Sequence, residues 1–284
     1  MTSKLTVQLE GGCGNQLFQF FAGLYLAQKT GKYLYVDTRQ IESNRHAGHG
    51  IFDNRYFTDI DQVSFISEAE RGKFRKKSRK LLGKDFRAHG VGFPRNFASI
   101  NKAELITGYF QTYFFIEKLI KNGSVDVAEL RSNLFIEGKN RILRNIDFAN
   151  SAVIHIRGGD YLAQKETIGV LSTAYYSAVS RRLPTELTST YIVSDETEEV
   201  ISKRIGSSFH YQYIDTSKLH PLEVIGLISQ FGNIGISNST LSWWGAYLQK
   251  SGRVIAPTEW FRTLEQPYLL MPPDWALEST VWEE

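Results

Sequence analysis

Residues 155–161, His-Ile-Arg-Gly-Gly-Asp-Tyr, bring a histidine, an arginine and an aspartate together around two consecutive glycines. The residues before them, 151–156, have the pattern of a buried strand, and the glycines end that strand and let the backbone approach a ligand closely. His155 and Arg157 are two positions apart, so on a strand both side chains point to one face. A permanently charged guanidinium at the carboxyl end of a strand is suited to binding a phosphate. The plainer alternative is a surface salt bridge between Arg157 and Asp160.

A second polar block, residues 235–242, is predicted to be a strand that runs into a helix. Hydroxyl and amide side chains crowd the first turn of that helix, namely Asn238, Ser239, Thr240 and Ser242. Together with free backbone N–H groups they could hold an anion without a metal or a lysine. Ordinary capping needs only one such residue, so we favour ligand binding. Asp195 ends another predicted strand and could accept a hydrogen bond from a base or a ribose, or instead N-cap the next helix.

A glycine-rich block follows the first predicted strand. Gly12-x-Gly14, with Asp37 at the end of the second strand, resembles half of a dinucleotide-binding fingerprint, but Leu17 stands where the third glycine belongs. Asn15 and Gln16 open the helix, whose N-terminus favours an anion or a polar sugar. Asn15 could equally be a simple N-cap. This block keeps a nicotinamide-dependent reductase open as an alternative function.

The remaining pattern predicts elements that could position these residues. In the first half we expect strands at 4–9, 33–36 and 105–109, a helix at 16–30 and another opening at 113–116. In the second half we expect strands at 152–157, 190–194, 209–214, 233–237 and 253–256, with helices at 173–183, 196–205, 221–231 and 240–250. Such alternation predicts an α/β protein with two Rossmann-like domains that face a cleft. We place them at residues 1–148 and 149–284, the second ending in an irregular, proline-containing tail.

Charge is unevenly distributed along the 284 residues, whose net charge is +3. Nine Lys or Arg and a single acid lie between Arg71 and His89. This segment could rest on an anionic membrane surface, bind nucleic acid or be a solvated helix or loop. Nucleic acid ranks lowest, because no aromatic or recognition-helix pattern accompanies the charge.

Other features of the composition bear on the compartment and on cofactors. No apolar run is long enough to span a bilayer, and no apolar signal segment follows Met1. Cys13 is the only cysteine, which excludes an intrachain disulfide and favours a reducing compartment. We therefore expect a soluble cytoplasmic protein. His46 and His49 lack the further ligands of a metal site, so no metal is expected.

Four blocks in order carry a resemblance to a known family. They are Gly11-Gly12-Cys13-Gly14-Asn15-Gln16-Leu17-Phe18-Gln19, Gly108-Tyr109-Phe110-Gln111, His155 to Tyr161, and Ser237-Asn238-Ser239-Thr240-Leu241-Ser242-Trp243-Trp244-Gly245-Ala246. The chain resembles the bacterial α-1,2-fucosyltransferases of glycosyltransferase family 11 from residue 5 to about residue 260. The resemblance implies a GT-B-like fold and metal-independent, inverting transfer of L-fucose from GDP-fucose to the 2-hydroxyl of a terminal galactose. The product would be a bacterial surface glycan such as an O-antigen, or an oligosaccharide.

The resemblance also implies roles for individual residues. Arg157 would hold the donor pyrophosphate, with His155 beside it, and Asn238, Ser239, Thr240 and Ser242 would close over the phosphates. Gly14, Asn15 and Gln16 would face the cleft from the amino-terminal, acceptor-side domain, opposite the GDP-binding domain, and would contribute to donor binding. The family often has a second arginine where this chain has Gly158, so donor affinity would depend more on Arg157. Asp160 is our candidate for deprotonating or orienting a β-galactoside acceptor that could be lipid-linked, and its alternative role is to orient Arg157.

These expectations leave rivals from other classes. One is the reductase, and another is a non-catalytic glycan- or membrane-binding protein that uses the basic segment and the aromatic residues. GDP-fucose turnover separates the fucosyltransferase from both.

Overall fold

The computed structural model describes residues 3–43, 49–66, 85–135, 143 and 145–284. Contacts divide the chain into two compact units: unit 1, Met1–Leu130 with Pro267–Leu270, and unit 2, Arg131–Gln266 with Met271–Glu284. The sequence instead suggested a boundary at residue 148 and no return of the tail. The difference arises because the last turn of helix α6 (Val127–Leu134) belongs to unit 2. The backbone of Leu134 packs closely on Gly226 of the same unit, since a Cβ added at Gly226 would lie 2.5 Å from the carbonyl carbon of Leu134.

The tail returns to unit 1 through backbone hydrogen bonds. Phe93 N–H donates to the Tyr268 carbonyl at 2.9 Å, and Tyr113 N–H donates to the Leu269 carbonyl at 3.1 Å. The hydroxyl of Thr112 donates to the same Leu269 carbonyl at 2.8 Å. Four residues far along the chain are therefore part of the first unit.

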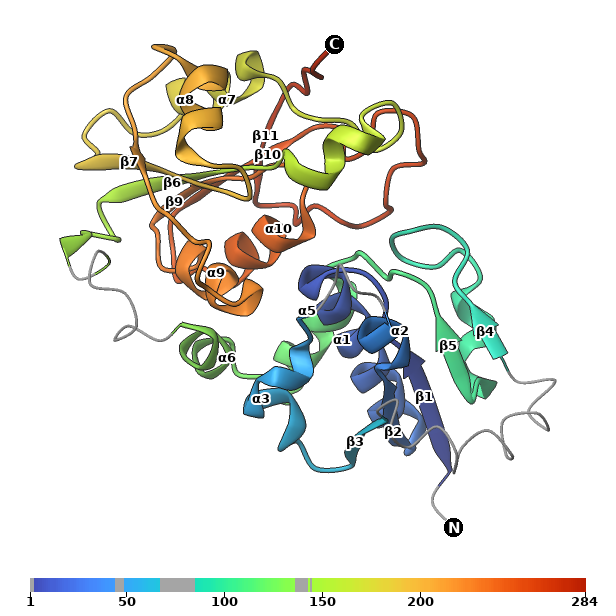
Figure 1. Ribbon diagram of the computed structural model, residues 1–284. Coiled ribbons are helices and arrows are strands. Elements are labelled where there is room, and N and C mark those ends of the chain that lie inside the picture. Colours follow the sequence, from blue (N-terminus) through green and yellow to red (C-terminus); the bar gives the residue numbers. More distant parts are fainter. Residues whose placement is uncertain (1–2, 44–48, 67–84, 136–142, 144) are drawn as a thin grey trace. The chain divides into compact units, whose positions relative to one another are not determined.

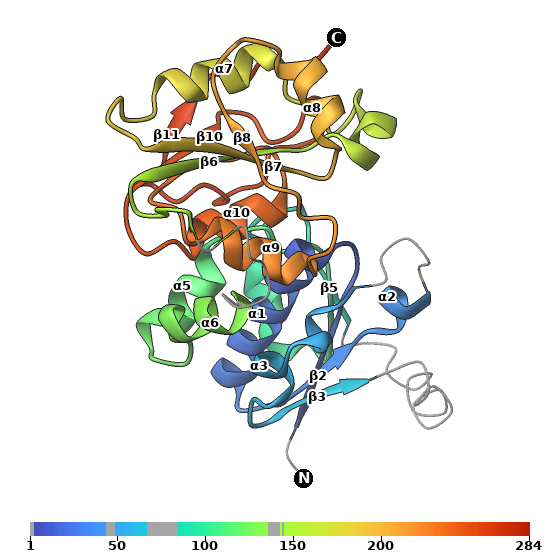
Figure 2. The same ribbon diagram turned by 60° about the vertical axis from the view of Figure 1, so that its left-hand side comes forward.

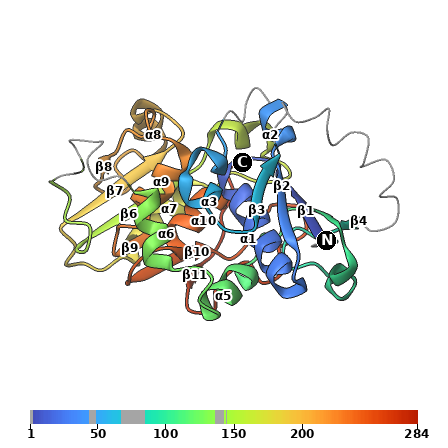
Figure 3. The ribbon, with the colours of Figure 1, turned by 90° about the horizontal axis from the view of Figure 1, so that it is seen from below.

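Unit 1 is built on a five-stranded parallel sheet of order β3-β2-β1-β5-β4 (Figures 1 and 3). Its strands are β1 (Lys4–Gln8), β2 (Tyr33–Asp37), β3 (Val63–Ile66), β4 (Asp85–Arg87) and β5 (Leu105–Thr107). The long helix α1 (Cys13–Thr30) packs on β1 and β2, and α5 (Phe114–Lys121) packs on α1. Gly31 ends α1 in the left-handed region at φ 63°, which glycine adopts without steric cost. Short helices α2 (Arg39–Ser43) and α3 (Arg55–Thr58) follow β2.

Unit 2 is built on a six-stranded parallel sheet of order β11-β10-β9-β6-β7-β8 (Figure 3). Its strands are β6 (Ser151–Ile156), β7 (Ser189–Ser194), β8 (Gln212–Tyr213), β9 (Asn233–Gly235), β10 (Arg253–Pro257) and β11 (Ala276–Glu278). Helices α7 (Thr173–Arg181) and α8 (Glu198–Ile205) cover one face, and α9 (Pro221–Ile228) and α10 (Thr240–Tyr247) cover the other (Figure 2). All six residues of β6 are buried, as expected for a strand inside a sheet covered on both faces.

The predicted α/β class with two Rossmann-like domains is confirmed, and the predicted helices and inner strands lie close to their expected positions. Three expectations were wrong in detail. The strand expected at 209–214 is reduced to the two residues of β8. The tail, expected to be irregular, contains strand β11, and strands β3 and β4 were not predicted. Residues 71–84, which are most of the basic segment 71–89, lie outside the described residues, so the roles proposed for this segment stay predictions. Among the helices that the structure describes, none has the length and apolar character to cross a membrane.

Candidate functional site

Arg157 lies at the carboxyl end of the central strand β6, where the main chain leaves the sheet. Its Nη2 is 2.5 Å from Asp160 Oδ1, and its Nη1 is 3.0 Å from Asp195 Oδ2. The guanidinium also lies over the ring of Tyr161, 5.0 Å from the ring centroid. Burial alone would lower the pKa of Arg157, but Asp195, Tyr161 and Asp160 raise it above the ordinary value. Arg157 is therefore a fixed cation held by its own neighbours.

Asp195 comes from the end of the adjacent strand β7 and contacts both parts of the motif. Besides pairing with Arg157, its Oδ1 accepts a hydrogen bond from Gly158 N–H at 3.1 Å. The alternative in which Asp195 N-caps the next helix is wrong, because Thr197 is the N-cap of α8 and accepts from Val200 N–H. Asp195 thus orients the guanidinium and the glycine turn together.

The absence of a side chain at Gly158 has a steric cause. A Cβ built there would lie 2.2 Å from the carboxyl carbon of Glu196, far inside contact distance. The Glu196 carboxylate is fixed by an ion pair with Arg204 from α8, whose Nη2 donates to Glu196 Oε1 at 3.2 Å. Burial raises the pKa of Glu196, and Arg204 opposes that effect. An arginine at position 158 would therefore have to displace this ion pair.

His155 is a buried, neutral member of the site. It is 2% exposed, and its Nδ1 lies 2.9 Å from Ser237 Oγ. Burial, with a smaller contribution from Arg157, lowers the pKa of His155 to about 3. The ring therefore acts as a hydrogen-bonding group rather than as a second cation. Ser237 was not among the predicted site residues, although it lies inside the polar block 235–242, two positions after strand β9, which pairs with β6.

Two of the predicted polar side chains at the start of α10 form hydrogen bonds to other parts of the protein. Asn238 Nδ2 donates to the carbonyls of Ile168, Gly169 and Trp260 at 3.1–3.3 Å, and so ties three loops together. Ser242 Oγ donates to the Ser239 carbonyl at 3.0 Å. Ser239 is the N-cap but makes no side-chain capping bond, and Thr240 is half-buried. Their roles toward a ligand stay predictions.

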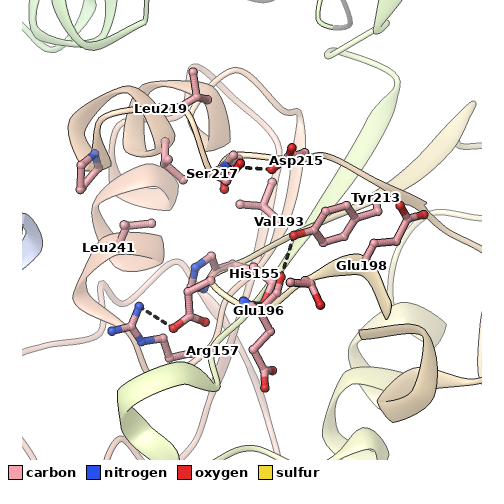
Figure 4. A pocket seen from close by; sticks show the side chains of 16 residues that line it. His155, Arg157, Val193, Glu196, Glu198, Tyr213, Asp215, Ser217, Leu219 and Leu241 are labelled. Carbon is pink, nitrogen blue, oxygen red and sulfur yellow. Dashed lines mark hydrogen bonds and ion pairs between the residues drawn. The ribbon is translucent and has the colours of Figure 1, made fainter. Parts of the chain in front are cut away.

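A cavity of about 500 Å³ opens beside these residues (Figure 4). Of the predicted site residues, His155, Arg157 and Asp195 line it, so the two side chains expected on one face do share it. Its size is within the range of small-molecule sites. None of the residues of the remaining wall was among the predicted site residues, and this wall comprises Val193, Ser194, Glu196, Thr197, Glu198, Tyr213, Asp215, Thr216, Ser217, Leu219, Pro221, Val224 and Leu241.

The glycine-rich block of unit 1 forms the first turn of α1, which contains Gly14, Asn15 and Gln16. Gly12 is the N-cap, so the N-cap alternative for Asn15 is wrong. Asn15 Oδ1 instead accepts from Gln111 Nε2 at 3.0 Å. Gln16 is fully buried, donates to the Gly11 carbonyl at 2.9 Å and accepts from the N–H of residue 51 at 3.0 Å. Its side chain holds the loop after residue 48, and its role toward a donor stays a prediction.

The structure gives Asp37 and the position of Leu17 roles other than binding a nicotinamide cofactor. The Asp37 side chain is 3% exposed and pairs with Arg39, whose Nε donates to Asp37 Oδ1 at 2.7 Å. Leu17, at the position of the missing glycine, is fully buried in the core. A carboxylate engaged in this way is poorly placed to bind a ribose, which weakens the reductase alternative.

Two Rossmann-like units, one with a nucleotide-sized cavity beside an arginine at a strand end, are typical of GT-B glycosyltransferases. The family model described as Glycosyl transferase family 11 matches residues 110–266. The match covers more than half of the chain, and the protein belongs to this family. The family resemblance seen in the sequence is thereby confirmed.

Two relatives from Escherichia coli are similar over nearly their whole length. An "Alpha-1,2-colitosyltransferase" is 27% identical and covers 93% of this chain and 94% of its own. The "O-antigen biosynthesis glycosyltransferase WbnK" is 24% identical and covers 89% and 93%.

Solved structures share the fold at low sequence identity. The fucosyltransferase NodZ from Bradyrhizobium matches with a TM-score of 0.52 at 12% identity, over 89% of this chain and 94% of that one. Arabidopsis thaliana FUT1 in complex with GDP matches with a TM-score of 0.52 at 12% identity, over 96% and 72%. These likenesses confirm the predicted GT-B-like fold class.

Proposed function

We propose that this family 11 glycosyltransferase moves L-fucose from GDP-fucose to the 2-hydroxyl of a terminal galactose, in the assembly of a bacterial O-antigen or a related glycan. The observation that carries the proposal is the position of Arg157, a fixed cation at the mouth of a nucleotide-sized cavity in unit 2. The family membership and the names of the two Escherichia coli relatives support it.

The chemistry of such a transfer makes a fixed cation useful. As the bond between the sugar C1 and the phosphate oxygen breaks, its electron pair leaves with the diphosphate and the sugar becomes oxocarbenium-like. Arg157 stabilises the growing negative charge, and because its neighbours already hold it in place, little reorganisation is needed. The acceptor oxygen attacks C1 from the opposite face, which inverts the configuration, and its proton passes to Asp160. In this proposal the guanidinium and backbone N–H groups take the role that a divalent metal has elsewhere.

The rest of the cavity suits a guanosine. Its walls carry carboxylates at Asp195, Glu198 and Asp215, which can accept from ribose hydroxyls and from the N–H groups of guanine. The pKa of Asp215 is lowered by hydrogen bonds from Ser217, so this carboxylate is ionised and acts as an acceptor. Neutral His155 adds a hydrogen-bonding group that can face a phosphate without repelling the neighbouring cation.

A second donor is favoured by one relative. Colitose is fucose without its 3-hydroxyl, and the 27% identical relative is named a colitosyltransferase. The same leaving group and the same attack would serve both sugars. The choice between them therefore depends on contacts to the 3-hydroxyl, and colitosyl transfer is our second candidate.

The remaining parts of the proposal concern the acceptor and the compartment. We assign acceptor binding to unit 1, we propose that Gly14, Asn15 and Gln16 contribute to donor binding, and we expect the reaction to take place in the cytoplasm. Contact of residues 71–89 with the inner membrane face would suit a lipid-linked acceptor.

A donor screen tests the proposal. The protein is incubated with galactose-terminated oligosaccharides and GDP-fucose, GDP-colitose, GDP-mannose or UDP-galactose, and product and GDP release are measured. We expect turnover with GDP-fucose or GDP-colitose, and loss of about a hundredfold or more in Arg157→Ala, as for removal of one oxyanion donor.

Matched controls make this screen decisive. Arg181→Ala, at an exposed position on α7, should keep full activity. Near-normal turnover by the Arg157→Ala protein would refute the assignment. Absence of turnover with every donor, combined with thermal stabilisation by NADPH but not by GDP, would favour the reductase instead.

A further inference from the structure

The guanidinium of Arg157 is already engaged by two carboxylates of its own unit. Asp195 holds Nη1 at 3.0 Å and Asp160 holds Nη2 at 2.5 Å. Nε is buried and, among the residues that the structure describes, has no hydrogen-bond partner. An anion that approaches from the cavity therefore cannot reach Nε, and it meets the guanidinium at Nη1 and Nη2, each of which already donates to one of the two carboxylates.

The two carboxylates are held very differently. Asp195 has a 26% exposed side chain and a second bond, from Gly158 N–H. Asp160 has a 64% exposed side chain and lies on a short 3-10 helix (Gly159–Gln164), and within the described part of the chain its side chain bonds only Arg157. Exposed ion pairs of this kind are weak, because water and ions compete for both partners. Asp160 is thus the carboxylate that an incoming anion can displace.

Arg157 keeps its position when Asp160 leaves. Asp195 still holds Nη1, and the Tyr161 ring still supports the guanidinium, 5.0 Å from its centroid. Tyr161 is anchored in turn, because its hydroxyl donates to the Asn238 carbonyl at 3.3 Å. Displacing Asp160 therefore frees one carboxylate without freeing the arginine.

We propose that Asp160 and the donor diphosphate compete for the same N–H groups of Arg157, so that donor binding releases Asp160 to act on the acceptor. This inference rests on the proposed function. The diphosphate takes over Nη2, and the freed carboxylate accepts the proton of the acceptor hydroxyl as its oxygen bonds to C1 and the diphosphate leaves. Two consequences follow: the acceptor is activated only after the donor has bound, and Asp160 weakens donor binding while it speeds transfer.

The opposite effects of Asp160 on donor binding and on sugar transfer can be measured separately, and together they test the proposal. GDP binding is measured by calorimetry on the wild-type protein, Asp160→Asn and Asp160→Ala, and transfer is measured at saturating donor. We expect both variants to bind GDP about two- to fivefold more tightly, the range of an exposed ion pair. We expect their kcat to fall by about a hundredfold or more, the contribution of a general base. Asp147→Asn is the matched control, since Asp147 lies before the opposite end of β6 and, among the described residues, its side chain bonds Asn150 alone.

The outcomes separate the inference from the function on which it rests. If the wild-type protein binds GDP and transfers the sugar but both Asp160 variants bind GDP equally or more weakly, the competition is refuted. If the wild-type protein does not bind GDP, the proposed function itself fails.

Steady-state kinetics provides a test that needs no variant. Donor-first binding predicts that GDP inhibits competitively against the donor and noncompetitively against the acceptor. Competitive inhibition by GDP against the acceptor would overturn the proposed order.

Discussion

His155 makes the stability of unit 2 depend on pH. Burial lowers its pKa from 6.5 to about 3, so the folded protein excludes a proton that the unfolded chain binds below pH 6.5. The neutral ring therefore contributes stability above pH 6.5, and this stability is lost as the pH falls from 6.5 toward 3. Each pH unit in that window is worth about 1.4 kcal/mol, so lowering the pH from 6.5 to 5 costs roughly 2 kcal/mol.

The perturbation that isolates this effect is His155→Asn. An asparagine amide can still meet the hydroxyl of Ser237, but it does not titrate. We expect the difference in unfolding free energy between wild type and variant to shrink by roughly 2 kcal/mol between pH 7.5 and pH 5. Other titrating groups are common to both proteins and cancel in this difference.

Urea denaturation followed by tryptophan fluorescence is the appropriate assay. All five tryptophans belong to unit 2, so the signal reports that unit alone: Trp243, Trp244, Trp260, Trp275 and Trp282. His210→Asn, at an exposed position in the same unit, is the control for replacing a histidine that is not buried, and it is measured over the same pH range. A difference for His155→Asn that does not change with pH would refute the conclusion that the buried ring stays neutral.

Two further predictions follow from buried groups. Gly158→Ala should destabilise unit 2 by about 1–3 kcal/mol, because its methyl group overlaps the Glu196 carboxyl. The same change in a Glu196→Ala background should cost clearly less in urea denaturation, and an equal cost would exclude this clash as the cause. Cys13 should react with a thiol reagent at pH 8 at least about a hundredfold more slowly in the folded protein than in urea, because burial and Asp53 raise its pKa to about 12. Rapid labelling of the folded protein, followed by absorbance, would contradict this placement.

The inner elements of both sheets were predictable because burial leaves a strong pattern in the sequence. Strand β6 is buried throughout and is mostly apolar, with a glycine pair after Arg157, and α1 combines helical apolar spacing with a terminal glycine. The edge strands leave no such pattern. Strand β4 is three residues with two exposed ends. Strand β11 follows two prolines and is defined by pairing with β10, whose paired residues lie 21 positions earlier in the chain. Such strands are specified by tertiary hydrogen bonds rather than by local sequence.

The candidate site was predictable where charged or polar side chains stand next to glycines at the end of a predicted strand. Arg157, His155 and Asp195 lie together because parallel neighbours β6 and β7 end at the same edge of the sheet. The wall around Tyr213 and Asp215 was missed, since single polar residues after a two-residue strand form no motif. For Asn238, a run of polar residues suggested ligand binding. In the structure its Nδ2 group donates instead to three backbone carbonyls of neighbouring loops.

The path of the main chain limits how this enzyme can be divided. Because residues 267–270 belong to the first unit while the segments on either side belong to the second, the polypeptide passes between units three times. A single proteolytic nick after residue 130 would divide the chain into two polypeptides, and residues 267–270 of the first unit would stay on the carboxyl-terminal one. A gene fragment ending there would lack the short tail segment that bonds Phe93, Thr112 and Tyr113. Separate expression of the two parts would therefore require the tail segment to be grafted onto the amino-terminal fragment.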